Sequence, residues 1–214
     1  MEVQKKTSYT QSNRAIQYTH IVNDSKAVCF MFSGAGYNYD KPLFYYSTMI
    51  MLENNFDVIH IHYSYDEREF NLTINEFTDL MVEDVTTVVK DVLEKGEYSQ
   101  TIFLGKSLGT IPITASLAKN ENYSHSKVIL LTPLLKIDLF YKGILESQNE
   151  TFMVIGKNDA HYVQEKIKKL DEKSNLVIKG IDNANHSLDV EPFDYTSSLK
   201  ALSEMMKDLN NFLN

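Results

Sequence analysis

The sequence predicts an α/β fold in which a mostly parallel central sheet carries helices on both faces. Strand-like and helix-like segments alternate along the whole chain of 214 residues, as they do in successive βαβ units. The chain has no internal repeat, no low-complexity tract and no linker rich in proline or glycine. Residues 1–214 are therefore expected to form one domain, and this length allows a full hydrophobic core.

The first half of the chain contains three predicted strands and two predicted helices. Arg14–Val22 alternates polar and apolar residues like an edge strand, whereas Lys26–Phe32 and Phe56–Tyr63 are more apolar strands. A proline, which suits the first turn of a helix, precedes the helix predicted over Leu43–Asn54. Apolar residues recur with a helical period in Ile74–Lys95, which predicts a long helix.

The second half continues the alternation. Short apolar segments predict four strands, at Gln100–Gly105, Val128–Leu131, Thr151–Ile155 and Leu176–Ile181. Helical patterns follow these strands, at Leu108–Lys119, Phe140–Ser147, Val163–Leu170 and Ser197–Leu213. Because a helix follows each strand, we expect the strands to be parallel neighbours joined by helical crossovers.

Composition narrows the class of protein. The hydrophobic content of 43% and the charged content of 23% are ordinary for a globular protein. A net charge of −8 argues against nucleic acid and anionic membrane surfaces as partners, since both attract clustered Lys and Arg. Cys29 is the single cysteine, which excludes an intramolecular disulfide. No signal-peptide core and no apolar run of roughly 20 residues is present, so we expect a cytoplasmic protein.

The most specific motif in the chain is the run Gly105-Lys106-Ser107-Leu108-Gly109. A predicted strand ends in this Gly-x-Ser-x-Gly pattern and a predicted helix follows it. The turn must be sharp, with Ser107 in strained backbone geometry and its Oγ raised above the sheet. The two glycines remove Cβ atoms that would collide with the strand and the helix. The motif therefore predicts a serine nucleophile.

The segment has two other interpretations. Gly-Lys-Ser also ends a phosphate-binding P-loop, but that loop needs a glycine at position 100, where Gln100 begins a predicted strand. The second alternative is a serine at an ordinary strand–helix junction. That alternative holds only if no base and no acid stand at suitable places elsewhere in the chain.

A candidate acid and a candidate base follow the ends of two later strands. Functional side chains collect at the carboxyl ends of parallel strands. Asp159 follows the strand that closes with Gly156, and His186 lies in the loop after the last strand. His161, directly beside the acid at a helix start, is a poorer geometric partner for the serine than His186. Asp182 competes with Asp159, but it lies in the same strand and loop as His186 itself.

With these residues the chain resembles the α/β-hydrolase superfamily over nearly its whole length. The matching segments are Gly105–Gly109, Gly156–Asp159, Asn185–Ser187 and the loop Ser33–Gly36, with the order Ser, Asp, His. The resemblance implies Ser107 as nucleophile, His186 as general base and then acid, and Asp159 as the group that orients His186. Such a triad is needed because a serine hydroxyl is a weak nucleophile until an imidazole takes its proton.

The same resemblance implies an oxyanion hole. One donor should be the N–H of Leu108, at the start of the helix after the nucleophile. Related hydrolases often carry His-Gly-Ala-Gly after an early strand, where this chain has a serine at position 33 followed by Gly-Ala-Gly. By that match the second donor is the N–H of Ala35, with Gly36 or Tyr37 as alternatives. The serine in place of the histidine means that the loop must be held in a different way.

Lys106 is a candidate for contact with an acidic substrate group. We favour the simpler interpretation that it is a solvated surface charge or pairs with a nearby carboxylate. Tyrosines also follow two predicted strands, at Tyr37 and Tyr39 and at Tyr63 and Tyr65. They either line an aromatic substrate pocket or pack at the sheet edge.

No cofactor or metal is expected. His60 and His62 share one face of a strand, but no further ligand cluster completes a metal site, so packing histidines are expected. Only Thr132–Glu150 separates two of the later strands, which leaves room for one helix and predicts a small cap or none. An open site of this kind suits a small molecule better than an emulsified lipid.

The sequence thus predicts a cofactor-free serine hydrolase that cleaves a small ester or thioester through an acyl-enzyme on Ser107. A carboxylesterase is the favoured interpretation, but thioesterases, peptidases and acyltransferases use the same triad. The alternative from another class is a catalytically silent α/β-hydrolase-fold protein that binds a small ligand or partner. Geometry distinguishes them, because an enzyme needs His186 within hydrogen-bond reach of Ser107 and Asp159.

Overall fold

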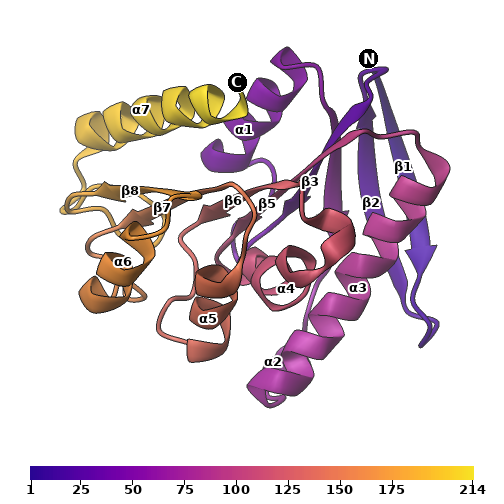
Figure 1. The fold of residues 1–214 in the computed structure, drawn as a ribbon, viewed down its shortest axis with the longest axis horizontal. Helices are drawn as coiled ribbons and strands as arrows, with labels where there is room; N and C mark the ends of the chain where they lie inside the picture. Colours follow the sequence, from indigo (N-terminus) through magenta and orange to yellow (C-terminus); the bar gives the residue numbers. More distant parts are fainter.

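A single sheet forms the centre of the computed structural model, which describes residues 1–214 (Figure 1). Its eight strands follow the order β1-β2-β4-β3-β5-β6-β7-β8. The strands are β1 (Glu2–Tyr9), β2 (Ala15–Val22), β3 (Ala27–Phe32), β4 (Asp57–His62), β5 (Gln100–Lys106), β6 (Lys127–Leu131), β7 (Thr151–Gly156) and β8 (Leu176–Ile181). β2 is antiparallel to both of its neighbours, and every pair from β4 to β8 is parallel.

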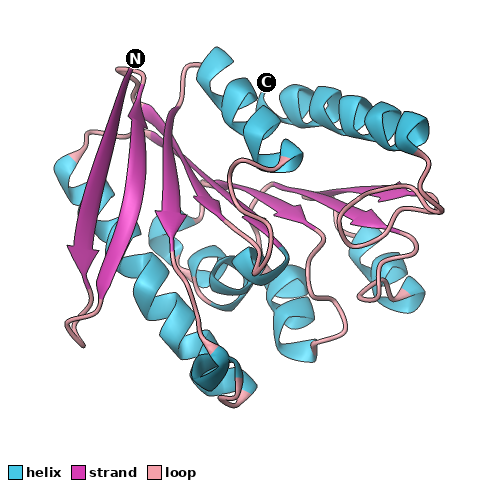
Figure 2. Ribbon diagram, turned by 180° about the vertical axis from the view of Figure 1, so that it is seen from behind, coloured by secondary structure: helices cyan, strands magenta, loops and turns pink.

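Helices cover both faces of this sheet. They are α1 (Pro42–Glu53), α2 (Glu67–Phe70), α3 (Ile74–Lys95), α4 (Thr110–Ala115), α5 (Asp138–Glu146), α6 (Gln164–Asp171) and α7 (Tyr195–Leu213). α1 and α7 lie side by side on one face, and α3 to α6 lie on the other (Figures 1 and 2). The chain is therefore a single α/β domain with three layers.

The interior strands are apolar on both sides because both faces of the sheet are covered. In β3, Phe30 and Phe32 belong to the core beneath α3 and α4, which includes Val88. Cys29 and Met31 belong to the opposite core, beneath α1 and α7. This arrangement explains why Lys26–Phe32 shows a continuous apolar run rather than alternation.

Every strand predicted from the sequence is confirmed, with ends that agree closely. The strand β1 and the short helix α2 are not predicted from the sequence. The side chains of β1 are mostly exposed, and this strand pairs only with β2, from Glu2 opposite Val22 to Tyr9 opposite Ala15. An edge strand with one solvated side carries little hydrophobic pattern, so its pairing partner identifies it better than its composition.

The helix predicted over Leu108–Lys119 is wrong in its extent. The segment forms a 3₁₀ turn at Ser107–Gly109, the short helix α4, and a second 3₁₀ turn at Leu117–Lys119. Pro112 removes one backbone donor inside this segment, and the β-branched residues around it are poor helix formers. The segment nevertheless begins with a helical turn, of the 3₁₀ type, at Ser107.

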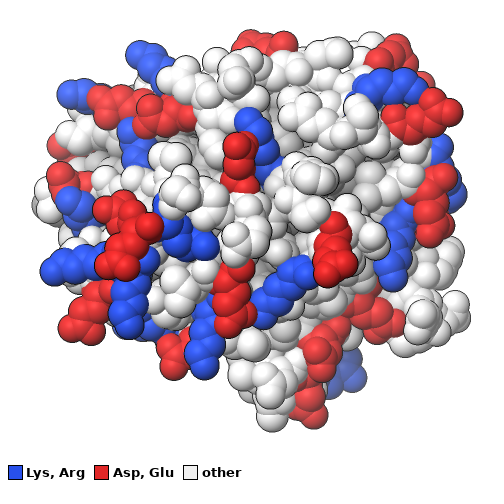
Figure 3. Space-filling view, viewed as in Figure 1, with Lys and Arg blue, Asp and Glu red and all other residues white.

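The outer surface of the domain carries charges of both signs. On the face seen in Figure 3, acidic and basic side chains are interspersed. None of the helices has the length and apolar character that crossing a bilayer requires.

Candidate active site

Ser107 stands at a sharp turn directly after β5. Its φ is 51°, in the left-handed region that residues other than glycine rarely adopt. The flanking glycines allow the turn to pack closely. A Cβ on Gly109 would lie 2.0 Å from the Phe32 carbonyl oxygen, and one on Gly105 would lie 2.4 Å from the Gly109 oxygen. Both positions therefore require glycine, as the motif predicted.

Three predicted side chains meet at the carboxyl edge of the sheet. The His186 Nε2 atom lies 2.7 Å from Ser107 Oγ. The other ring nitrogen, Nδ1, lies 2.7 Å from Asp159 Oδ2. Ser107 follows β5, Asp159 follows β7 and His186 follows β8, so parallel strands far apart in the sequence bring the three together.

The Asp159 carboxylate is buried and fully engaged. Its Oδ2 faces His186, while its Oδ1 accepts a hydrogen bond of 2.7 Å from the backbone N–H of His161. Burial by itself would raise the pKa of Asp159, but the hydrogen bonds from His186 and His161 outweigh it, and the pKa lies below its ordinary value. The group is therefore ionised at neutral pH and can hold an imidazolium.

The competing residues lie elsewhere. The His161 ring is beside that of His186, with ring centroids 5.6 Å apart, and its hydrogen bond to Asp159 comes from the backbone. Asp182 is an exposed residue that pairs with Lys157 at 2.6 Å. Neither residue makes a hydrogen bond to Ser107 or to the His186 ring, and this ring contacts both Ser107 and Asp159.

The candidate oxyanion donors border the nucleophile. Leu108 lies in the first turn of a 3₁₀ segment, where N–H groups have no partner within the helix. The N–H groups of Ala35 and Gly36 make no hydrogen bond within the protein. The Tyr37 N–H instead donates to the Gly34 carbonyl at 3.3 Å, which removes Tyr37 from the candidates for this role.

Tyrosine hydroxyls hold the loop that follows β3. The Tyr63 hydroxyl donates to the Ser33 carbonyl at 2.5 Å, and the Tyr39 hydroxyl lies 2.7 Å from the carbonyls of Met31 and Ile61. These contacts hold the loop in a chain that has Ser33 where related hydrolases often have a histidine. They favour the packing interpretation for Tyr39 and Tyr63 over a role as pocket lining.

The expectation that Lys106 is a solvated surface charge is wrong. The residue is only 2% exposed, because it is the last residue of β5 and its side chain points beneath the loop that carries His186. Its Nζ donates to the hydroxyl of Thr132 at 3.2 Å and to the carbonyl of His186 at 3.1 Å. Lys106 is thus enclosed by the site rather than presented to solvent.

Sequence reasoning missed Thr132 as a residue of this site. It directly follows β6, at the same edge as Ser107, and its φ of 48° is also left-handed. Its position at a strand end was the available signal. His60, by contrast, stacks on Tyr39 with ring centroids 4.1 Å apart, as expected of a packing histidine, and burial lowers its pKa to about 3.

Comparison with known proteins identifies the family of the chain. A family model described as an alpha/beta hydrolase domain matches residues 25–214, so the chain belongs to the α/β-hydrolase family. A comparison with curated protein sequences gives no match.

Solved structures share the fold at low sequence identity. An esterase from Pyrococcus furiosus superposes with a TM-score of 0.75 at 13% identity, covering 99% of this chain and 91% of that one. A protein from Xanthomonas campestris, described as an α/β serine hydrolase without a lid, gives 0.70 at 11% identity, with coverage of 100% and 94%. An α/β serine hydrolase homologue from Coxiella burnetii gives 0.66 at 13% identity, with coverage of 96% and 97%. The family supports a hydrolase, and these neighbours show the fold.

Proposed function

We propose that the protein is a serine hydrolase that cleaves small esters or thioesters through an acyl-enzyme. The observation that carries this proposal is the continuous chain of contacts from Ser107 Oγ through His186 to Asp159, with both separations at 2.7 Å. These contacts support Ser107 as nucleophile, His186 as base and Asp159 as orienting acid, the three roles that acyl transfer requires.

The chemistry follows from these positions. Nε2 of His186 takes the proton of Ser107 Oγ as the oxygen attacks the substrate carbonyl carbon. Asp159 stabilises the resulting imidazolium, and the N–H groups of Leu108 and Ala35 stabilise the oxyanion. His186 then gives its proton to the leaving alcohol or thiol as the carbonyl re-forms. A water molecule, deprotonated by His186, releases the acid and restores Ser107.

The surroundings favour a small substrate. The only helix between β6 and β7 is α5, so no helical domain covers the carboxyl edge of the sheet. A cavity of about 350 Å³ is lined by residues that include Gly36, Tyr37 and Ser187, which are sequence neighbours of the candidate site residues Ala35 and His186. Its volume is at the lower end of the range for small-molecule sites. Carboxylesterase activity is therefore proposed ahead of thioesterase, peptidase or acyltransferase activity.

Labelling with a fluorophosphonate tests the proposal directly. Intact-mass spectrometry of the wild type should show one adduct, and Ser107→Ala should show none, because only an activated serine reacts. Hydrolysis of p-nitrophenyl acetate by the same two proteins provides the kinetic readout. A folded wild type that forms no adduct would contradict the proposal and favour the catalytically silent binding protein.

A further inference from the structure

Lys106 is the one fully buried lysine of the chain. Its ammonium has two hydrogen-bond acceptors, the Thr132 hydroxyl and the His186 carbonyl, and lies 4.6 Å from the centre of the Tyr37 ring. No carboxylate lies within ion-pair distance of Lys106. The ammonium is therefore held by neutral groups at the centre of the candidate site.

Such a position is unfavourable for stability. A buried charge loses its hydration, and replacing it with an apolar side chain of similar size commonly leaves a protein as stable or more stable. Burial lowers the pKa of Lys106 to about 8, with the more distant Asp159 and Asp189 opposing the shift in part. Packing alone thus gives no reason for a lysine here.

The contact with His186 provides a reason. The hydrogen bond from Lys106 is the only one that the backbone of His186 makes. The side chain of His186 is partly exposed, and its loop belongs to no helix or strand. Lys106 also immediately precedes Ser107 in the sequence. One residue therefore links the backbone of the nucleophile to the backbone of the base.

The contact of Lys106 with the Tyr37 ring also connects it to the loop that carries the candidate oxyanion donor Ala35. Tyr37 follows the loop with Ala35, and its hydroxyl accepts a hydrogen bond of 3.2 Å from the N–H of Leu43, in the first turn of α1. The ammonium of Lys106 over this ring is a cation–π contact. Lys106 thus touches the loops after β3, β6 and β8.

We propose that Lys106 is a positioning residue, which fixes the His186 loop at the distance from Ser107 that proton transfer requires. This inference rests on the proposed function, since the distance matters only if His186 is the base. It assigns Lys106 a role inside the site rather than contact with an acidic substrate group.

The test compares Lys106→Met with Lys157→Met. Both substitutions remove one ammonium at the carboxyl edge of the sheet, but Lys157 is half-exposed and pairs with the exposed Asp182. Lys106→Met should lower kcat for p-nitrophenyl acetate and the rate of fluorophosphonate labelling by about 10- to 100-fold, as expected for a misplaced catalytic group. KM should not fall below the wild-type value. The midpoint of thermal unfolding should not fall below the wild-type value either, because a buried charge has been removed. Lys157→Met should behave as the wild type does.

Thr132→Val provides a second variant, in which Lys106 remains but loses one of its two acceptors. It should lower kcat in the same direction as Lys106→Met and by less. Wild-type kcat in Lys106→Met, or a loss of activity that follows a fall in its unfolding midpoint, would overturn the inference. If Lys106→Met does not fold, unchanged kcat in Thr132→Val would overturn it. A wild type that is folded but unreactive would instead contradict the proposed function itself.

Discussion

Ser107 and Thr132 are both held in the left-handed region, with φ of 51° and 48°. A residue with a side chain pays about 1–2 kcal/mol for this backbone conformation, because its Cβ approaches the following carbonyl oxygen. Lys106 adds the cost of a buried charge. Three neighbours at the carboxyl edge of the sheet are therefore individually unfavourable, as is common where geometry serves a site rather than stability.

The strain at Ser107 leads to a stability prediction. Ser107→Gly should be more stable than Ser107→Ala by about 1 kcal/mol, because glycine adopts positive φ without penalty and both variants lack Oγ. Chemical denaturation measures this difference. The same pair of substitutions at Ser187, whose φ is not in the left-handed region, is the control. There the alanine variant should be at least as stable, and the same order at both positions would contradict the prediction.

The burial of Lys106 predicts a pH dependence of stability. Its pKa is about 8 in the folded protein and about 10.4 in an unfolded chain. Between these values the unfolded chain binds more protons, so the stability of the wild type rises with pH through this window. Lys106→Met should exceed the wild type by up to about 3 kcal/mol near neutral pH, with the advantage shrinking as the pH rises to about 10. Urea unfolding at both pH values measures the difference, and a gap independent of pH would contradict the prediction.

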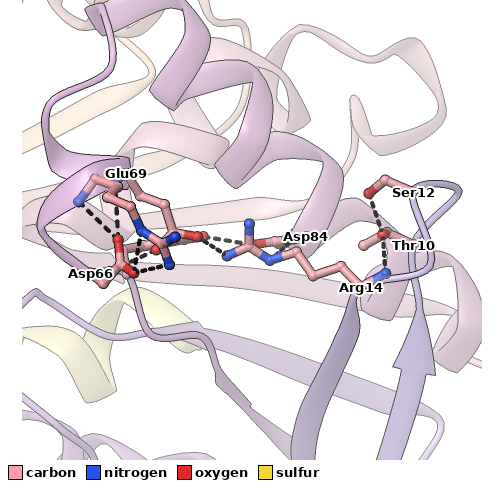
Figure 4. A network of polar contacts seen from close by, with 8 residues as sticks. Thr10, Ser12, Arg14, Asp66, Glu69 and Asp84 are labelled. Atoms are coloured by element: carbon pink, nitrogen blue, oxygen red, sulfur yellow. Dashed lines mark hydrogen bonds and ion pairs between the residues drawn. The ribbon is translucent and has the colours of Figure 1, made fainter.

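Among the elements, the β1–β2 hairpin depends on α2 and α3 for its attachment at one end. Arg14 pairs with Glu69 at 2.8 Å and reaches Asp84 at 3.5 Å (Figure 4). Ser12 also donates to Glu83 at 3.2 Å. Asp84 is completely buried and also accepts a hydrogen bond of 3.0 Å from the Tyr65 hydroxyl. This network joins an edge strand, a short helix and a long helix.

Arg14→Met should weaken this attachment. Burial already raises the pKa of Asp84, and Arg14 is the main group that opposes the rise. Without it a buried carboxylate lacks its counter-charge, and we expect a loss of about 1–3 kcal/mol at neutral pH. A carboxyl whose folded pKa is raised contributes stability at low pH and loses it as the pH rises. The loss should therefore be smaller near pH 4.

Thermal unfolding at both pH values measures this effect. Lys26→Met is the control, because Lys26 and Glu97, which precede β3 and β5, form an exposed ion pair at 2.6 Å, and exposed pairs contribute little. It should show no clear change at either pH. An Arg14→Met loss that is equal at both pH values would show that Asp84 is not its cause.

For the whole molecule, two separate hydrophobic cores share one sheet. Leu117 is buried in the core beneath α3 and α4, and Leu209 is buried in the core beneath α1 and α7. The strands between them contribute alternate residues to each core, as β3 does with Phe30 and Met31. Loss of either core would expose one face of strands that also form the other core, so the two cores should unfold together.

Leu117→Ala and Leu209→Ala test this coupling. Each should destabilise the protein by about 2–5 kcal/mol, because each removes a buried side chain and leaves a cavity. In both variants the unfolding transition followed by far-ultraviolet circular dichroism should coincide with that followed by tyrosine fluorescence. Separate transitions in either variant would mean that the cores unfold independently.

The sequence alone determined the helices and turns whose form depends on residues close together in the chain. The helix Ile74–Lys95 has the predicted ends because its apolar period and its capping box of Thr73 with Glu76 are local. The glycines around Ser107 are likewise a local requirement of the turn. Strand order then placed Asp159 and His186 at the same edge, since parallel strands end together.

Only the tertiary structure decided what depends on segments distant in the sequence. The strand β1 exists because β2 offers a partner, and its own residues show little hydrophobic pattern. Lysine is a residue type that usually lies at the surface. Lys106 is nevertheless enclosed by Thr132 and by the His186 loop, which is 80 residues away along the chain. Burial is a property of the assembled fold, because a side chain is shielded by whatever the chain brings against it, and a local pattern does not record those neighbours.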